Sequence, residues 1–204
     1  MRLEPLLSRQ AGVISREQAL RSGLGAAEVD RLVRTRRWRP LHPRVYLVTG
    51  YEPGDEARAR AAVLWAGAGS VLSGAAAAWW HGLLAEAPPT LGVIAATRRP
   101  ARPGVAVRCG RLHAADRAER RGLPVTAVGL TVLEAAAELG GPAGELLLRR
   151  ALPEIGWAEV LAAHRRNPTL AGKALLSAAA SRACAQRDLH HLCARIGPST
   201  GRWR

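Results

Sequence analysis

The chain has 204 residues, 48% of them hydrophobic, which is enough to bury a core as one large domain or two small ones. It has no run of about 18 apolar residues, no signal-peptide core after Met1, and three cysteines (Cys109, Cys184 and Cys193) without CxxC spacing. These features exclude a membrane span and a disulfide framework, and they lead us to expect a cytoplasmic protein. The formal net charge is +14, and because Lys173 is the only lysine, arginine supplies nearly all of the positive charge. Such a charge favours a polyanionic partner.

A short helix is expected at residues 3–10, followed by two helices and a hairpin within residues 15–48. Ser15 and Gln18 have the spacing of a capping box, which starts the second helix. Gly23 stands where that helix would end in a left-handed conformation. Gly25, followed by Glu28, then starts the third helix.

The third helix is predicted to carry Ala26, Val29, Leu32 and Val33 on one face and arginines elsewhere. Strands at 38–41 and 45–48 follow, joined by the turn His42-Pro43-Arg44. A helix with one apolar and one cationic face suits the major groove of DNA. The predicted DNA-contacting residues are the arginines of this helix and hairpin: Arg31, Arg34, Arg36, Arg37, Arg39 and Arg44. Arg31, Arg34 and Arg36 are the expected groove contacts.

These elements predict an N-terminal winged helix-turn-helix at residues 1–50, with a domain boundary in the turn-rich segment 49–54. A mixed α/β domain with a small sheet and several helices is expected at 55–180, so the fold class is α+β. The alternative for the first unit is a small helical subdomain with a solvated basic face. If so, DNA binding would be absent.

Within the second domain a helix is expected at 55–66, with Arg58 and Arg60 pointing away from its apolar face. Ser73 is expected to cap an alanine-rich helix ending at Trp79-Trp80-His81. Because neighbouring helical residues point about 100° apart, at most one of the two tryptophans should lie fully in the core. The pair either packs in the core or forms a patch for a protein partner.

Further along, strands are expected at 91–96 and 105–109, joined by a proline-rich cationic loop. Residues 123–126 are a short strand or extended entry. Thr131 and Glu134 have capping-box spacing and would start a helix that runs to Leu139. More helices are expected at about 143–151, 156–164 and 169–185, and the end of the chain loses its periodicity.

No constellation in the sequence supports catalysis or a cofactor. After residue 160 the only acidic residue is Asp188, so a magnesium-dependent nuclease site has no carboxylate pair. Cys184, His190, His191 and Cys193 do not have the usual spacing of zinc ligands. We therefore expect no enzyme activity, no metal and no cofactor.

Four blocks of sequence resemble the actinobacterial AbiEi-like antitoxins, a family of winged-helix transcriptional regulators. The blocks are RQAGVISR (9–16), RWRPLHPRVY (37–46), VLSGAAAAWWHGL (71–83) and RGLPVT (121–126), in that order. The resemblance implies a winged helix that binds double-stranded operator DNA and autorepresses its own operon. It also implies an α/β domain that neutralises a nucleotidyltransferase-like toxin, as in type IV toxin–antitoxin systems.

Many members of that family carry a further domain similar to very-short-patch-repair endonucleases. Residues 181–195 resemble the helix that begins that domain, so 181–204 is expected to be a truncated, frayed remnant. Two alternatives to the DNA-binding regulator follow. The chain is a protein-interaction module only, or it is a non-functional remnant of a nuclease-fused protein.

Overall fold

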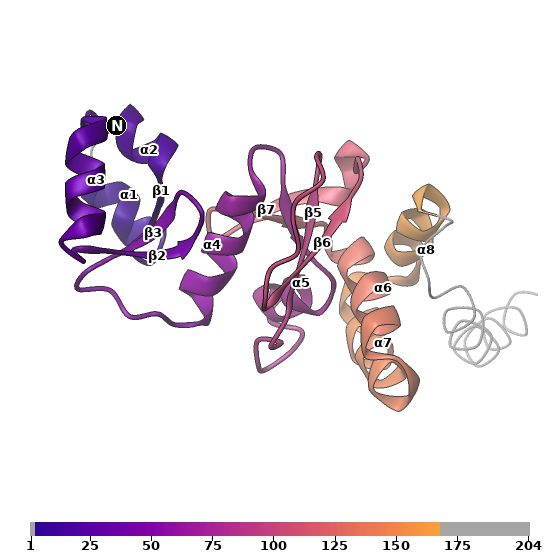
Figure 1. Ribbon diagram of the computed structural model, residues 1–204. Helices are drawn as coiled ribbons and strands as arrows, with labels where there is room; N and C mark the ends of the chain where they lie inside the picture. The colour runs from indigo at the N-terminus through magenta and orange to yellow at the C-terminus, as the bar shows by residue number, and fades with distance from the viewer. Residues whose placement is uncertain (1–2, 168–204) are drawn as a thin grey trace, which may run out of the picture.

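Two β-sheets with helices packed against them make up residues 3–167, the part of the chain that the computed structural model describes (Figure 1). The expected α+β class is confirmed. The helix expected at 169–185, the remnant at 181–204 and the Cys184–Cys193 group lie outside the described residues. The helices are α1 (Leu3–Arg9), α2 (Arg16–Arg21), α3 (Ala26–Arg34), α4 (Asp55–Ala66), α5 (Gly74–His81), α6 (Val128–Leu139), α7 (Gly141–Ile155) and α8 (Trp157–Arg166). The strands are β1 (Val13–Ser15), β2 (Trp38–His42), β3 (Val45–Val48), β4 (Val71–Ser73), β5 (Leu91–Ala95), β6 (Val105–Cys109), β7 (Arg117–Arg120) and β8 (Leu123–Thr126).

The N-terminal unit runs α1-β1-α2-α3-β2-β3, and its three strands form an antiparallel sheet in the order β1-β3-β2. The capping box that starts α2 is confirmed. The hydroxyl of Ser15 accepts from the backbone N–H of Gln18 at 3.1 Å, and the Gln18 side chain accepts from the backbone N–H of Ser15 at 3.0 Å. Gly23, with φ +97°, allows the sharp turn between α2 and α3. Strand β1 was not predicted from the sequence, because three residues are too few to show an alternating pattern.

The second unit is built on a five-stranded sheet in the order β6-β5-β4-β8-β7. β5 and β6 are parallel, as are β4 and β8, while β4–β5 and β7–β8 are antiparallel. Helices α5 and α6 pack closely on each other, and α7 and α8 pack on α6. The helices predicted at about 143–151 and 156–164 are therefore present, although α7 is longer than expected because Gly141 and Pro142 begin it instead of ending α6.

One hydrophobic core runs across the segment at 49–54, where the domain boundary was predicted. That segment has no helix or strand, yet Val13, Val45 and Leu47 of the first sheet share a cluster with α4 and the second sheet. A second cluster lies within the N-terminal unit, where Val29 of α3 packs against Trp38 and Tyr46. Helix α4 therefore joins the two sheets.

Arg60 was expected to point away from the core, and that expectation is wrong. Its side chain is only 4% exposed, and its guanidinium binds Glu56 at 2.8 Å and the carbonyl of Arg121 at 2.8 Å. It also lies 5.3 Å from the centre of the Trp80 ring. Burial of the charge is tolerated because Nε and Nη2 both donate hydrogen bonds. Trp80 is fully buried while Trp79 is half-buried, as the helical spacing predicted.

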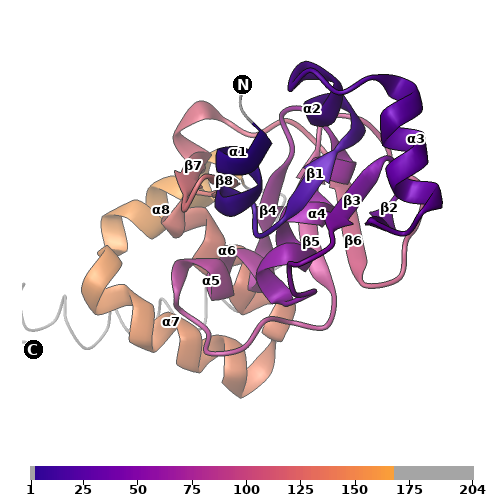
Figure 2. The same cartoon turned by 90° about the vertical axis from the view of Figure 1, so that its left-hand side faces the viewer.

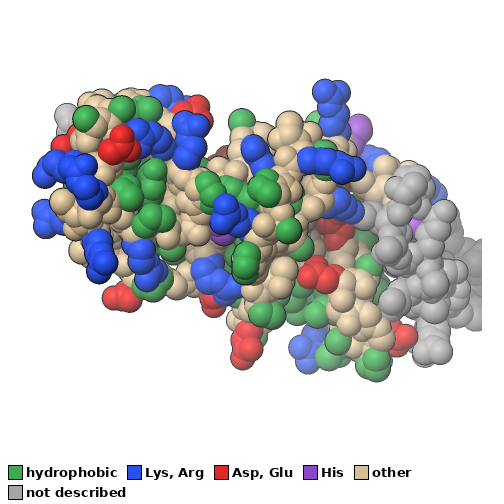
Figure 3. All heavy atoms as spheres, viewed as in Figure 1, with side chains coloured by type: hydrophobic (Ala, Val, Ile, Leu, Met, Phe, Trp, Pro, Cys, Tyr) green, Lys and Arg blue, Asp and Glu red, His purple; other side chains and the backbone are tan. Residues whose placement is uncertain are grey.

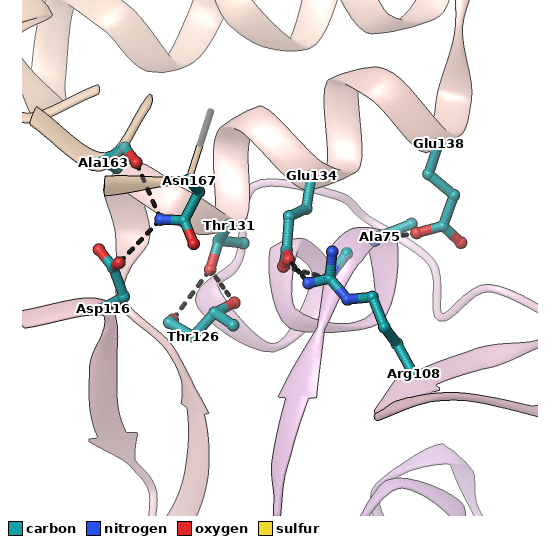
Figure 4. A network of polar contacts seen from close by, with 10 residues as sticks. Ala75, Arg108, Asp116, Thr126, Thr131, Glu134, Glu138, Ala163 and Asn167 are labelled. Carbon is teal, nitrogen blue, oxygen red and sulfur yellow. Dashed lines mark hydrogen bonds and ion pairs between the residues drawn. The ribbon is translucent and has the colours of Figure 1, made fainter. Parts of the chain in front are cut away.

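Both capping roles predicted in the second unit are wrong. Ser73 stands at the N-cap of α5 but makes no side-chain cap, because carboxylates of α6 take its place. The backbone N–H of Gly74 donates to Glu134, and that of Ala75 donates to Glu138 at 2.8 Å (Figure 4). Helix α6 begins at Val128, so Thr131 lies inside it and donates to the carbonyl of Thr126 at 2.9 Å.

Candidate nucleic-acid interface

Helix α3 has one buried and one charged face, as its sequence predicted. Val29 is fully buried and Leu32 and Val33 pack beside it, while Asp30, Arg31 and Arg34 are exposed. Ala26, predicted on the apolar face, is exposed because it stands in the first turn, where the helix leaves the core. The charged face of α3 is therefore free to meet a large polar partner.

Both carboxylates of α3 are neutralised by arginines. Asp30 accepts two hydrogen bonds from Arg16 of α2, at 2.5 and 3.1 Å, and these bonds lower the pKa of Asp30. Glu28 accepts two from Arg31, at 2.6 and 2.9 Å, which lowers the pKa of Glu28 in the same way. Because each carboxylate is paired with a guanidinium, neither would repel an approaching phosphate with an uncompensated negative charge.

The structure divides the six predicted DNA-contacting arginines by their partners. Arg31 is engaged with Glu28. Among residues 3–167, no acidic side chain lies within ion-pair distance of the other five: Arg34, Arg36, Arg37, Arg39 and Arg44. All five are exposed. Blue side chains crowd the lobe at the left of Figure 3, where α3 and the hairpin lie.

Arg44 stands apart from the rest of this set. Arg34, Arg36, Arg37 and Arg39 follow one another from the end of α3 into β2, whereas Arg44 occupies the hairpin turn. Arg39 and His42 are three steps apart along β2, which is about 10 Å. The turn lies against α4, because the His42 ring stacks on Trp65 with centroids 5.3 Å apart and an interplanar angle of 27°.

Two of the candidate residues have a backbone conformation that side chains seldom adopt. Arg36 has φ +58° and Arg44 has φ +64°, in the left-handed region. Glycine or asparagine is the usual residue there. Strained non-glycine residues are enriched at functional positions, where the side chain itself is needed. Arginine at these turns thus favours a role for its charge.

A hollow of about 370 Å³ lies between β6 and α6 in the second unit. Its charged lining is Arg108, Glu134 and Glu138, and all three are used within the protein: Arg108 pairs with Glu134, and both acids cap α5 (Figure 4). Burial raises the pKa of Glu134, and the pairing with Arg108 opposes that rise. This network fixes α6 against α5, and among the described residues it leaves no charged group of the hollow without a partner.

Elsewhere in residues 3–167, no cluster of three or more His, Cys, Asp or Glu side chains is arranged to hold a metal ion. No helix in this part of the chain is both long and apolar enough to cross a membrane. Two of the histidines serve structural roles: His42 stacks on Trp65, and His81 binds the carbonyl of Thr126 at 2.9 Å.

The sequence did not single out Arg16 or the loop arginines Arg98, Arg99 and Arg102 as parts of an interface. Arg16 binds Asp30 across 14 positions, and spacing along the chain does not reveal such a pair. The loop was recognised as cationic, but its place beside the hairpin depends on how β5 and β6 meet α4. The one signal in the sequence is the mixture of arginine and proline at 98–103, which indicates an exposed, extended segment.

Comparisons with known proteins find a solved structure of similar fold, but they do not assign the chain to a family. No protein-family model matches the chain, and no curated protein matches it. Among solved structures, it is similar to the RV2827C protein from Mycobacterium tuberculosis, with a TM-score of 0.54 and 18% sequence identity. The match covers 79% of this chain and 69% of the other. At this identity the likeness shows the shared fold alone.

Proposed function

We propose that this protein binds double-stranded DNA through a winged helix-turn-helix formed by residues 3–48, with α3 in the major groove. The observation that carries the proposal is the row of exposed arginines that form no ion pair within the described residues and run from α3 into β2: Arg34, Arg36, Arg37 and Arg39. Like charges held together without counter-charges repel each other, so a polyanion would stabilise them. A helix followed by a β-hairpin gives this charge a shape that fits a groove and its flanking backbone.

The ion pairs of α3 support the same proposal. Asp30 is held by Arg16 and Glu28 by Arg31, so the acids of the helix are screened from phosphates. The Arg31–Glu28 pair is exposed, and exposed pairs are weak enough to exchange a carboxylate for a phosphate. Arg31 therefore stays among the proposed groove contacts, with Arg34 and Arg36.

The test is a salt titration of DNA affinity with the full chain and a duplex from its own upstream region. Arg34→Gln/Arg39→Gln removes two charges that form no ion pair in residues 3–167. Arg31 is a poorer choice, since its loss would expose the charge of Glu28. We expect the slope of log affinity against log salt to become shallower by about 0.9 for the lost phosphate contact of Arg39, and the affinity to fall further with the lost groove contact of Arg34.

Arg149→Gln/Arg150→Gln is the matched control, because both residues are exposed on α7, in the other unit. It removes the same charge, and its salt slope should equal that of the wild type. Absence of binding at low salt would overturn the proposal. Equal slopes for the two double variants would overturn the assignment of α3 and β2 as the interface.

On the resemblance of four blocks between residues 9 and 126 to AbiEi-like antitoxins, the proposal extends to autorepression and to neutralising a nucleotidyltransferase-like toxin. A reporter behind its own promoter should be derepressed by Arg34→Gln/Arg39→Gln. Co-expression with a nucleotidyltransferase encoded beside it should restore growth with either protein, since neutralisation would use the second unit. Growth rescue without any repression by the wild type would instead favour a protein-interaction module.

A further inference from the structure

The loop that joins β5 to β6, residues 96–104, carries Arg98, Arg99 and Arg102, and all three are exposed. One of them positions the loop. Nε of Arg99 donates to the carbonyl oxygen of Ala66, the last residue of α4, at 2.8 Å. A cation at the carboxyl end of a helix is favourable, because the free carbonyls there carry partial negative charge. This bond fixes the loop against the end of α4.

The same end of α4 supports the hairpin turn of the N-terminal unit. Trp65 stacks on His42, and Trp65, Pro43, Arg44 and Arg99 line one hollow of about 360 Å³. Arg102 is close enough to His42 for its charge to contribute, after burial, to the lowered pKa of that ring. Figure 2 looks onto the side of the molecule where β2, α4, β5 and β6 come together. The loop and the hairpin turn, more than 50 residues apart in sequence, are therefore neighbours.

Positive charge gathers here without compensation. Within residues 3–167, no ion pair joins Arg44, Arg98, Arg99 or Arg102 to an acidic side chain. Glu17 also lines the hollow, but its carboxylate lies 3.5 Å from Arg21. Arg44 keeps a left-handed backbone at this point. A cluster of guanidiniums that form no ion pair with an acid of the described residues favours an anion from outside the chain.

We propose that Arg98 and Arg102 form a second contact with the DNA backbone, beside Arg44, so that the interface extends from the N-terminal unit onto the five-stranded sheet. The inference rests on the proposed function. The cationic row then runs from Arg34 along the hairpin to the loop. Its hairpin part is about 10 Å long, similar to the major groove, which is about 12 Å wide. With α3 in the groove, the loop meets the phosphates that flank it. Arg99 is a positioning residue, since its guanidinium holds the loop on α4.

The test compares Arg98→Gln/Arg102→Gln with the matched control Arg149→Gln/Arg150→Gln, both in the full chain. The probe is the duplex used above, in a full-length form and a form trimmed by half a helical turn at each end in turn. We expect the loop variant to have a salt slope shallower by about 1.8 and to lose hydroxyl-radical protection at one flank of the site. Trimming that flank should weaken the wild type to the affinity of the loop variant and leave the loop variant unchanged.

The outcomes separate the two proposals. If the wild type binds no duplex at low salt, the proposed function fails and the inference fails with it. If the wild type binds and Arg34→Gln/Arg39→Gln weakens it, while the loop variant equals the control, the inference alone is overturned. It is also overturned if the loop variant binds more weakly but trimming either flank leaves the wild type unchanged, because the arginines would then not touch the flanking backbone.

Discussion

His42, in the hairpin of the N-terminal unit, stacks on Trp65 of α4 with ring centroids 5.3 Å apart. The pair joins the element that is proposed to contact DNA to the helix that links the two sheets. We expect a double-mutant cycle of His42→Ala and Trp65→Ala to give a coupling free energy of about 1 kcal/mol, typical of aromatic pairs. Urea unfolding of the four proteins measures it. Additive losses would show that the stacking contributes nothing beyond the burial of each ring.

The two half-buried histidines, His42 and His81, should make stability depend on pH. Burial lowers the pKa of both His42 and His81 below the usual 6.5 in the folded protein. The unfolded chain therefore binds more protons below about pH 6.5, so the free energy of unfolding should fall as the pH drops from 7 toward 5. His42→Gln/His81→Gln should lose less stability over the same range. Glu134 titrates in both proteins, so its opposite contribution cancels in the comparison. Parallel pH profiles would contradict the prediction.

The left-handed backbone of Arg44 allows charge and fold to be separated. Arg44→Ala and Arg44→Gly remove the same side-chain charge, but only glycine relieves the strain at φ +64°. We expect the glycine variant to be more stable than the alanine variant by about 1 kcal/mol in urea unfolding. Their DNA affinities should be equally reduced relative to the wild type. A glycine variant that binds DNA like the wild type would show that the arginine side chain is not a contact.

Gly144 tests the packing of α7 on α6. A Cβ at this position would meet the carbonyl oxygen of Ala136 far inside contact distance. Alanine normally stabilises a helix interior relative to glycine by about 1 kcal/mol, but here we expect Gly144→Ala to destabilise by about 1–3 kcal/mol through overpacking. Gly110→Ala is the control, because a Cβ there meets nothing within 4 Å. Equal unfolding free energies for the two variants would contradict this close approach.

Local signals in the sequence predicted much of the fold. The Ser15–Gln18 capping box, the turn at Gly23 and the amphipathic pattern of α3 depend on residues a few positions apart, and the structure has all three. What failed depends on distant partners. The α5 N-terminus is capped by Glu134 and Glu138, some 60 residues away, so the local capping signal at Ser73 gave a wrong prediction. The signal at Thr131 was also wrong, because α6 begins before it, at Val128.

The candidate site was predictable to a similar extent. The exposed arginines of α3 and β2 could be listed from periodicity and charge. The partners of other arginines could not, because Arg16 reaches Asp30 from another helix and Arg99 reaches the carbonyl of Ala66 in α4 from the loop between β5 and β6. Arg60, placed on a polar face by its position in α4, is buried because Glu56 and the carbonyl of Arg121 receive its hydrogen bonds. Burial of a charge depends on such tertiary partners, which periodicity does not register.

The core that crosses residues 49–54 has a consequence for how copies of the protein would sit on an operator. Val45 and Leu47 pack in the same cluster as Ala62 and Val93, so the first sheet cannot turn without moving the second. A molecule anchored in a groove by α3 would project its five-stranded sheet at a fixed angle from the DNA axis. The closest spacing of two half-sites would then be limited by the width of the whole molecule, and an operator with half-sites one helical turn apart would admit two copies only if their second units point away from each other.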